Sequence, residues 1–323
     1  MRDNRVWVLL QEAITRQVPA ALMVVIDSQS SSPGRQGFKM AIDLEGNLAG
    51  SIGGGLMEHD LVEKTKEQLH ARFNHPILLN QLHNDSGEAK DRSGMICSGS
   101  QKVVIYPISL ASESVFQFLQ QPLKEIPTVL QLSQTGLSLI PKKNHCFEGR
   151  YFCDSVADTS WCYREDLSFQ KVLYIIGGGH VSLALSRIME TLDFYVVVFD
   201  DRPKVSTLEN NLFAQEKHII SYEQVGSHIQ EGERCYAVIM TASHKADHIV
   251  LEQLVNKRLR YLGMMASKAK GKAIFNQLLS KGIDQGRLSK VHTPVGLPIA
   301  SKTPEEIAIS ISAEIVSCEH DQL

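Results

Sequence analysis

The C-terminal half of the chain alternates short, wholly apolar runs with helical or polar stretches. The apolar runs lie at residues 171–176, 194–199, 218–222, 235–240 and 260–265. A strand that is buried on both faces reads as a continuous apolar run, and alternation with helices is typical of a parallel sheet with helices on both sides. We therefore predict a doubly wound, Rossmann-like α/β domain.

The N-terminal half has a different pattern, with amphipathic helices and strands that follow one another directly. We predict helices over 6–17 and 55–71, strands over 21–28, 77–81 and 102–108, a pair of strands joined by a turn at 45–47, and a small antiparallel meander over 128–163. These elements indicate an α+β domain over residues 1–168, followed by the Rossmann-like domain over residues 169–323.

A glycine loop joins the first apolar strand of the C-terminal half to the helix that follows. Gly177, Gly179 and His180 lie in this loop, and Asp200 closes the next strand 21 residues after Gly179. Glycines there let a backbone approach a pyrophosphate at a helix N-terminus, and an acidic residue at this distance can bind a ribose. The pattern predicts that these four residues bind a nucleotide cofactor.

Two features of this loop leave other interpretations open. Ser182 replaces the last glycine of the G-x-G-x-x-G pattern, and similar sheets bind other phosphorylated ligands. Asp200 alternatively serves as a cap or pairs with Arg202. An NAD(P)-dependent oxidoreductase that uses this domain is therefore the competing functional hypothesis, with NAD(P) or FAD as cofactor.

A second run of glycines, Gly53, Gly54 and Gly55, precedes the predicted helix of the N-terminal half. No Lys-Ser or Lys-Thr follows it, so it is not a Walker-type phosphate loop. Its amides can cradle a phosphate or a ring oxygen. Alternatively, the glycines only make a tight crossing under another strand.

Polar residues near Gly53, Gly54 and Gly55, the first glycine loop along the chain, complete a candidate anion site. Arg35 and Lys39 lie on the preceding loop and strand, where they can neutralise a phosphate. Ser51 can donate a hydroxyl hydrogen bond. In the C-terminal half, Ser267 and Lys268 follow an apolar strand and can meet phosphate at the carboxyl edge of the sheet.

Composition and charge narrow the function classes. The 323 residues carry a net charge of −3 and include 43% hydrophobic residues, as expected of a globular protein without a nucleic-acid-binding face. We expect no membrane span, because the longest uncharged apolar run is well short of the roughly 20 residues that a bilayer requires. The N-terminus shows no signal core, and we predict a cytoplasmic protein.

Metal sites have weak candidates. The six cysteines form no CxxC pair, which excludes a zinc ribbon. Cys97 lies between small residues, and its thiolate can bind a soft metal such as molybdenum or contact the sulfurs of a dithiolene. Alternatively, it is a buried thiol. His244 and His248 are four residues apart and would share a helix face, which suits a metal ion. The interpretation that we favour is a loop at the carboxyl edge of the sheet, where open α/β folds bind ligands.

Several longer segments resemble the xanthine dehydrogenase accessory protein family (XdhC/CoxI). The resemblance is carried by SSPGRQGFKMAID, GSIGGGLMEHDLVE, MICSGS, IGGGHVSLAL, VFDDRP, MTASHKADHIVLEQL, YLGMMASKAKGKA and VHTPVGLPIASKTPEEIAISISAEIV, in the family's order and over nearly the whole chain. The sequence departs from the family pattern at Gly34, Ser98, Ala242 and Ala266.

This resemblance implies a molybdenum cofactor-binding accessory protein. Such a protein protects the cofactor and helps insert it into an apo xanthine dehydrogenase-type enzyme, without turnover of its own. The resemblance also implies a cofactor-sulfurating enzyme as a second partner and gives Cys97 a place in the cofactor site. The sequence leaves a homodimer open, and it does not decide which domain holds the cofactor.

Overall fold

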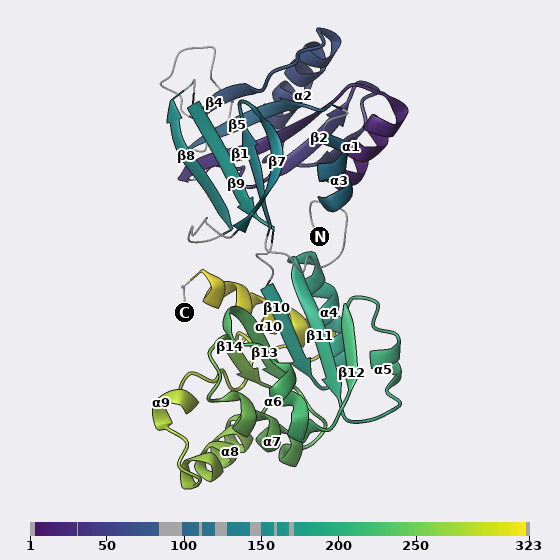
Figure 1. Ribbon diagram of the computed structural model, residues 1–323. Helices are drawn as coiled ribbons and strands as arrows, with labels where there is room; N and C mark the ends of the chain where they lie inside the picture. The colour runs from purple at the N-terminus through teal and green to yellow at the C-terminus, as the bar shows by residue number, and fades with distance from the viewer. Residues whose placement is uncertain are drawn as a thin grey trace. The chain divides into compact units, whose positions relative to one another are not determined.

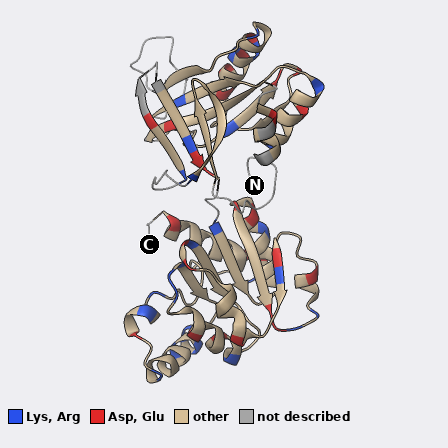
Figure 2. Cartoon of the chain, in the orientation of Figure 1, with Lys and Arg blue, Asp and Glu red and all other residues tan. Residues whose placement is uncertain are grey.

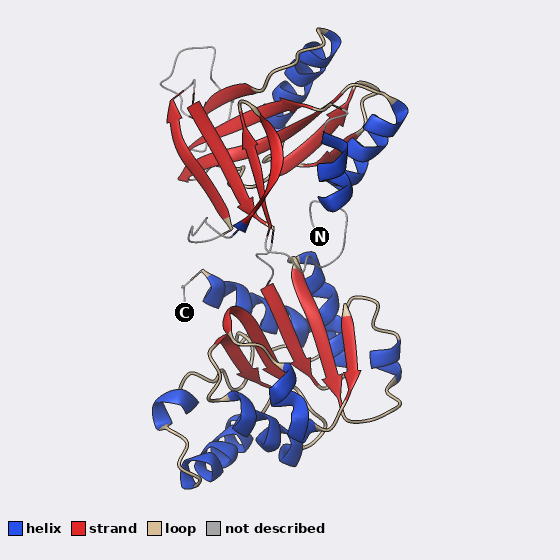
Figure 3. Ribbon diagram, viewed as in Figure 1, coloured by secondary structure: helices blue, strands red, loops and turns tan. Residues whose placement is uncertain are grey.

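The computed structural model forms two compact units, residues 2–169 and residues 170–323. It describes residues 4–30, 32–83, 99–109, 112–119, 128–142, 150–157, 160–167 and 171–320. The two units have different architectures, as the ribbon in Figure 1 and its colouring by secondary structure in Figure 3 show.

In its described residues, the N-terminal unit contains two antiparallel sheets and three helices. Its elements are α1 (Asn4–Arg16), β1 (Ala20–Ser30), β2 (Lys39–Asp43), β3 (Leu48–Gly50), α2 (Gly55–His70), β4 (Ile77–His83), β5 (Gly99–Pro107), α3 (Glu113–Leu119), β6 (Thr128–Ser133), β7 (Gly136–Pro141), β8 (Tyr151–Ala157) and β9 (Ser160–Asp166). The strand orders are β3-β2-β1-β5-β4 and β7-β6-β9-β8. The smaller sheet is antiparallel, as the sequence predicts, but it is not a meander, because β6 pairs with both β7 and β9 and thereby separates β7 from β8.

Strand β1 is apolar on both faces because each face packs against a different layer. Leu22 and Val24 belong to a core with α1, β6 and β9, whereas Met23 and Val25 belong to a core with α2. Successive side chains of a strand point to opposite faces, so both sets are removed from water. The continuous apolar run is therefore explained by burial on both sides.

The C-terminal unit has the predicted α/β architecture. Its elements are β10 (Lys171–Ile176), α4 (His180–Thr191), β11 (Phe194–Asp200), α5 (Ser206–Glu209), β12 (Glu216–Ile219), a 3₁₀ turn (Tyr222–Gln224), α6 (Val225–His228), β13 (Gly232–Ile239), α7 (His244–Leu254), β14 (Leu259–Met264), α8 (Lys268–Ser280), α9 (Gln285–Leu288) and α10 (Pro304–Glu319). The strands pair in parallel in the order β12-β11-β10-β13-β14. The doubly wound, Rossmann-like prediction is confirmed.

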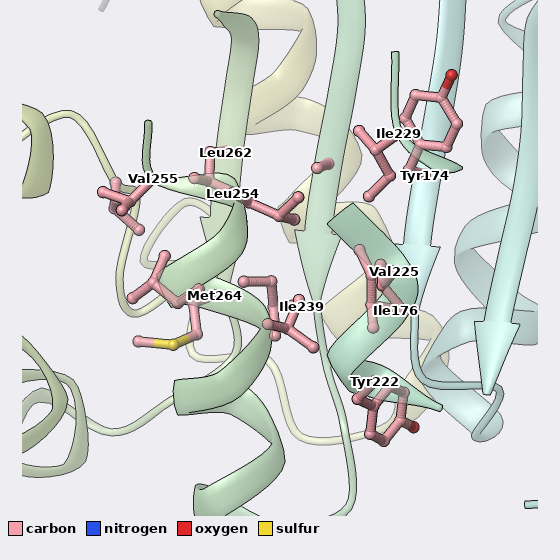
Figure 4. Packing of buried hydrophobic residues seen from close by; sticks show 14 of the residues in the cluster. Tyr174, Ile176, Tyr222, Val225, Ile229, Ile239, Leu254, Val255, Leu262 and Met264 are labelled. Carbon is pink, nitrogen blue, oxygen red and sulfur yellow. The ribbon is translucent and has the colours of Figure 1, made fainter. Parts of the chain in front are cut away.

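Helices cover both faces of this parallel sheet. One core joins the sheet to α6, α7 and α8, and Figure 4 shows Ile176, Ile239 and Met264 of three strands in this layer together with Leu254 of α7. The other core joins the sheet to α4 and α10. Because both faces are covered, function at this sheet is confined to its edges and loops.

Helix α10 begins where the sequence predicts a capping box. The Glu306 amide donates to the Thr303 hydroxyl oxygen at 3.2 Å, and the Thr303 amide donates to the Glu306 carboxylate at 3.0 Å. Pro304 occupies the start of the helix. These contacts satisfy donors that a helix N-terminus otherwise leaves open. No helix in the described parts of the chain combines the length and the apolar character that a membrane crossing requires.

Candidate functional site

The carboxyl edge of the C-terminal sheet is the first candidate site. The strand order changes direction between β10 and β13, and open α/β sheets bind ligands at such a switch point. The arrowheads of β10, β11 and β12 point to this edge in Figure 1. The loop after β10 carries Gly177, Gly178 and Gly179, and the loop after β13 leads into α7.

Of the three glycines in the β10 loop, Gly179 alone has free space beside its Cα atom. A Cβ on Gly177, whose φ is +117°, would lie 2.3 Å from the Met240 carbonyl oxygen, so this glycine serves backbone packing. A Cβ on Gly178 would approach Leu208 to 3.0 Å. At Gly179, by contrast, a Cβ would meet nothing within 4 Å. A ligand that reached this loop would therefore approach it at Gly179.

The N-terminus of α4 lies next to this opening. Gly179 is the N-cap and provides no side-chain cap, and His180 is the exposed first residue of the helix. Helix N-terminal amides and the helix dipole favour an anion. The neighbouring helices α7 and α8 are capped instead by the hydroxyls of Ser243 and Ser267, which accept from the amides of the third residue beyond each cap.

Asp200 is enclosed by donors from its own domain. Its carboxylate accepts from the Gly178 amide at 2.7 Å, from the Arg202 amide at 2.9 Å and from two nitrogens of the Arg202 guanidinium at 2.9 and 2.8 Å. Burial raises the pKa of Asp200, but the hydrogen bonds from Arg202 and Gly178 outweigh it and leave the pKa below its ordinary value. The carboxylate therefore stays ionised and fixes the glycine loop.

Helix α8 brings cations to the carboxyl edge, as the blue segments in Figure 2 show. Lys268 and Ser267 are exposed at its start. Lys270, two residues further on, pairs with Asp247 at 2.9 Å, and buried Asp247 also accepts from the Thr241 hydroxyl at 2.6 Å. Lys270 is thus committed to the fold, which leaves Lys268 as the exposed cation that the sequence predicts for a phosphate.

The two histidines proposed for a metal lie on α7. His244 begins the helix, and His248 Nδ1 lies 3.8 Å from a carboxylate oxygen of Glu252. Burial, with the charge of Lys281, lowers the pKa of His248. Across the described ranges, no group of three or more His, Cys, Asp or Glu side chains is arranged to hold a metal ion.

In the first glycine loop, around Gly53, the backbone and hydroxyl donors are hydrogen-bonded by the carboxylate of Glu58. One oxygen of this carboxylate accepts from the Ser51 hydroxyl at 2.7 Å, the Ile52 amide at 2.8 Å and the Gly54 amide at 3.0 Å. The Gly53 amide donates to the Ser51 hydroxyl oxygen at 3.2 Å. The donors that we expected to meet a phosphate therefore already hold an anionic group of the protein.

Gly53 also makes the tight crossing that was the alternative interpretation. A Cβ on Gly53, whose φ is +136°, would lie 2.7 Å from the Gly34 amide nitrogen. Buried Gln101 connects the two segments, because its side-chain oxygen accepts from the Gly34 amide at 3.1 Å and its side-chain nitrogen donates to the Ile52 carbonyl at 3.4 Å. Gly54 and Gly55 remain at the surface beside this crossing, and Arg35, the residue after Gly34, is exposed.

Lys39 lies in the core of the N-terminal unit instead of at a ligand surface. Its ammonium group has no exposed side-chain area, lies 2.8 Å from the Glu165 carboxylate and donates to the Gly37 carbonyl at 2.9 Å. The Trp7 and Tyr151 rings lie 5.8 and 5.7 Å away, at cation–π distance. A buried ammonium that is paired in this way serves the fold.

The last sequence candidate, Cys97, lies outside the described residues. A cavity of about 440 Å³ that no sequence pattern predicts lies elsewhere in the N-terminal unit, lined by Ile14, Val18, Leu69, Arg72, Phe73 and Ile108, among others. Its volume is within the range of small-molecule sites. Arg72 is the cation at its wall.

Sequence reasoning missed Glu58 and Gln101, the two side chains that organise the first glycine loop. A signal existed for Glu58, because an acidic residue in the first turn of a helix faces free backbone amides. Gln101 had no local signal, since its partners lie in two loops that are far away in the sequence. Its role is visible only in the folded unit.

Comparison with known families gives matches in both units. A family model described as the XdhC Rossmann domain matches residues 173–315, and one described as the XdhC and CoxI family matches residues 13–77. Together they cover most of the Rossmann-like domain and the first part of the N-terminal unit.

Individual relatives span almost the whole chain. YqeB of Escherichia coli (strain K12), an uncharacterized protein, is 25% identical over 304 residues, which is 94% of this chain but 44% of that protein. A protein of Bacillus subtilis (strain 168), described as a probable subunit of xanthine dehydrogenase, is 22% identical over 95% of this chain and 96% of its own length. This chain thus spans less than half the length of the first relative and nearly all of the second.

A solved structure shares the fold. The crystal structure of a protein described as a xanthine dehydrogenase, from Bacillus halodurans, superposes with a TM-score of 0.72 at 21% identity and covers 100% of this chain and 97% of the other. At this level of identity the match shows the fold.

Proposed function

The chain belongs to the XdhC and CoxI family, and from this premise we propose that it is an accessory protein of a xanthine dehydrogenase-type molybdoenzyme. In this proposal it binds the molybdenum cofactor, protects it and assists its insertion into the apoenzyme. The Bacillus subtilis relative, whose name refers to xanthine dehydrogenase, supports the choice of client, since it aligns along nearly its whole length.

The cofactor is a pterin with a phosphate and a dithiolene, so its site must accept an anion. The observation that carries the proposal is the N-terminus of α4, which has no side-chain cap and meets open space at Gly179. A phosphate there would accept from helix amides and lie in a favourable dipole. Ser267 and Lys268 extend the same edge with a hydroxyl group and a positive charge.

Each residue has a limited chemical task in this proposal. The amides after Gly179 orient the phosphate, and Lys268 neutralises it. Asp200 holds the loop in place through the Gly178 amide, so it acts as a positioning residue. When bound, the cofactor supplies the redox-active molybdenum of the client enzyme. The chain itself supplies binding and shielding.

The N-terminal loop has a weaker claim on the phosphate. A ligand at this loop would have to displace the Glu58 carboxylate from the amides of Ile52 and Gly54. Arg35 is exposed beside this loop, and Cys97 is the residue that the family resemblance offers to the dithiolene. We therefore assign the phosphate to the C-terminal edge.

The competing oxidoreductase hypothesis depends on Asp200 as a ribose acceptor. In the folded domain this carboxylate has no exposed side-chain area, and both of its oxygens accept hydrogen bonds from Gly178 or Arg202. A ribose would have to break a bidentate charged pair, which costs more than an ordinary hydrogen bond. This arrangement favours the accessory function over NAD(P) chemistry.

The partners follow from the same proposal. The client is an apo xanthine dehydrogenase-type enzyme, and a cofactor-sulfurating enzyme acts before insertion. We place both encounters in the cytoplasm. Whether the chain acts as a homodimer is a separate proposal that size-exclusion chromatography with light scattering would test.

A transfer assay tests the function directly. Purified protein incubated with a source of molybdenum cofactor, re-isolated and mixed with apo xanthine dehydrogenase should restore hydroxylase activity. The Ser267→Ala/Lys268→Ala variant should restore less activity at the same protein concentration. Equal restoration by free cofactor in buffer, under conditions where free cofactor decays, would remove the accessory role.

A further inference from the structure

Helix α10 and the segment after α9 bring a thiol, an imidazole and a carboxylate together in a row. Glu314 and Cys318 are four residues apart and so lie on one face of the helix. His292, from the segment after α9, lies between them. Its Nε2 is 3.8 Å from Cys318 Sγ, and its Nδ1 is 3.4 Å from a Glu314 carboxylate oxygen.

The His292 ring is held from two sides. Its backbone extends the sheet beside β14, because the His292 amide donates to the Leu262 carbonyl at 2.9 Å and its carbonyl accepts from the Met264 amide at 2.9 Å. Its ring stacks on Tyr261 with 4.6 Å between the centroids. The imidazole therefore keeps its orientation between the thiol and the carboxylate.

Glu314 is held as an anion. Its carboxylate accepts from the Tyr261 hydroxyl and from the Gly296 amide, the latter at 2.8 Å. Burial raises the pKa of Glu314, but hydrogen bonds from His292, Tyr261 and Gly296 outweigh it and lower the pKa below its ordinary value. Burial and the Glu314 charge also raise the pKa of Tyr261 well above its ordinary value, so this hydroxyl remains a donor.

The charge on Glu314 determines which imidazole nitrogen faces the sulfur as an acceptor. An ionised carboxylate only accepts hydrogen bonds, so the facing Nδ1 of His292 carries the proton. In the neutral ring Nε2 then has its lone pair toward Cys318. This is the order of nucleophile, base and orienting carboxylate that activates thiols in enzymes.

We propose that Cys318 is a nucleophilic thiol site that exchanges with disulfides, with His292 as its base and Glu314 as a positioning residue. Cys318 Sγ attacks one sulfur of a disulfide, and a new S–S bond forms as the old one breaks. The thiol proton passes to His292 Nε2 and then to the departing thiolate. The product is a mixed disulfide on Cys318, which a second thiol reverses by the same step.

Other cysteines of the chain supply internal controls. Burial raises the pKa of Cys153 to about 11, and its Sγ donates to the Asp154 carbonyl. Burial also raises the pKa values of Cys162 and Cys235. Cys318 is partly exposed, as Cys153 and Cys162 are, so a difference in rate would report the chemical state of each thiol more than its access, and the His292 variant isolates the part that comes from the imidazole.

Charged groups near the last turn of α10 contribute to the pH dependence of the Cys318 reaction rate. Arg260 donates to the Cys318 carbonyl at 2.7 Å, and Lys171 pairs with Glu319 at 2.9 Å. Tyr236 lies on the neighbouring strand and has a pKa raised by burial.

The test uses the reduced full chain and 4,4′-dithiodipyridine, with peptide mass spectrometry to resolve the rate at each cysteine. At pH 7, Cys318 should react at least about tenfold faster than Cys153, and His292→Ala should lower the Cys318 rate by about tenfold. His320→Ala, at the exposed end of the same helix, should leave it unchanged. Glu314→Gln should change the pH dependence of the rate, which a merely structural carboxylate would not do.

The wild-type pH profile keeps the proposal testable if a variant fails to fold. Below its pKa, an unassisted thiol reacts about tenfold faster for each unit that the pH rises, whereas a base-assisted thiol should show a flatter profile between pH 6 and 8. A Cys318 rate equal to that of Cys153, or a full tenfold rise per pH unit, would overturn the proposal. So would an unchanged rate in folded His292→Ala.

Discussion

The Arg202 guanidinium and the Asp200 carboxylate form a bidentate pair at the end of β11. Arg202 Nε donates to Oδ1 at 2.9 Å and Nη2 donates to Oδ2 at 2.8 Å. Asp200 has no exposed side-chain area, while Arg202 is 47% exposed. The acidic residue that a Rossmann pattern offers to a ribose is here turned inward, toward the protein's own glycine loop.

This pair predicts a loss of stability when its charge is removed. Asp200→Asn would leave Arg202 and the Gly178 amide without an anionic acceptor, and the free energy of unfolding should fall by about 2–3 kcal/mol. Urea denaturation would measure it, with the exposed neighbour Asp201→Asn as the matched control that changes little. A variant with unchanged stability but weaker NAD binding by calorimetry would restore the ribose role.

The pH dependence of this difference follows from the lowered pKa of Asp200. A carboxyl group with a depressed folded-state pKa stabilises the protein above its unfolded pKa and loses this contribution as the pH falls through the folded value. The stability difference between wild type and Asp200→Asn should therefore be largest near neutral pH and shrink from about pH 5 toward pH 2. A difference that grew on acidification would contradict the assigned contacts.

Lys39 should affect the fold and leave ligand retention unchanged. Lys39→Met would remove the ammonium partner of the buried Glu165 carboxylate, which would keep the Arg150 guanidinium at 3.0 Å and the Tyr163 hydroxyl at 3.4 Å, and should cost about 3 kcal/mol. The double variant Lys39→Met/Glu165→Leu should recover part of this loss. Lys102→Met, from a partly exposed pair with Asp27 at 3.9 Å, is the control expected to change stability little.

Glu58 should be important for the first glycine loop. Glu58→Ala would remove the acceptor of Ser51 and of two backbone amides, and we expect a loss of about 1–2 kcal/mol by thermal or chemical denaturation. Glu63→Ala on the same helix, whose pair with Lys66 is exposed, should behave like wild type. If Glu58→Ala is stable and gains affinity for inorganic phosphate, the loop is an anion site that Glu58 occupies.

Cations at the C-terminal edge should control cofactor retention. Lys268→Ala should weaken binding by about three- to tenfold, as expected for the loss of one phosphate contact near the surface, and the effect should shrink at high salt. Arg72→Ala changes the charge equally at the wall of the N-terminal cavity and should retain the cofactor. The opposite order of effects would move the site to the N-terminal unit.

Local patterns were sufficient for much of the fold. The apolar runs predicted the parallel strands because burial on both faces leaves no polar position in the buried part of a strand, as at 173–176 of β10 and 235–239 of β13. The capping box of α10 was readable because Thr303, Pro304 and Glu306 act on one another within a single turn. Both signals depend on neighbours in the sequence.

The candidate site was harder to predict because it depends on residues far apart in the chain. Lys39 appeared suitable for a phosphate until the fold brought Glu165 to its ammonium group. The relay from Cys318 to His292 also had no sequence signal, since a loop and a helix meet only in the folded domain. Spacing along the chain cannot report such contacts.

The most direct test of the central claim is the pterin content of the protein itself. The chain would be saturated with molybdenum cofactor, freed of unbound material, oxidised and extracted with denaturant, and the fluorescent pterin quantified against a molybdoenzyme treated in parallel. We predict close to one pterin per chain in wild type and a clear reduction in Ser267→Ala/Lys268→Ala. Absence of pterin from wild type, with full recovery from the molybdoenzyme, would contradict the account.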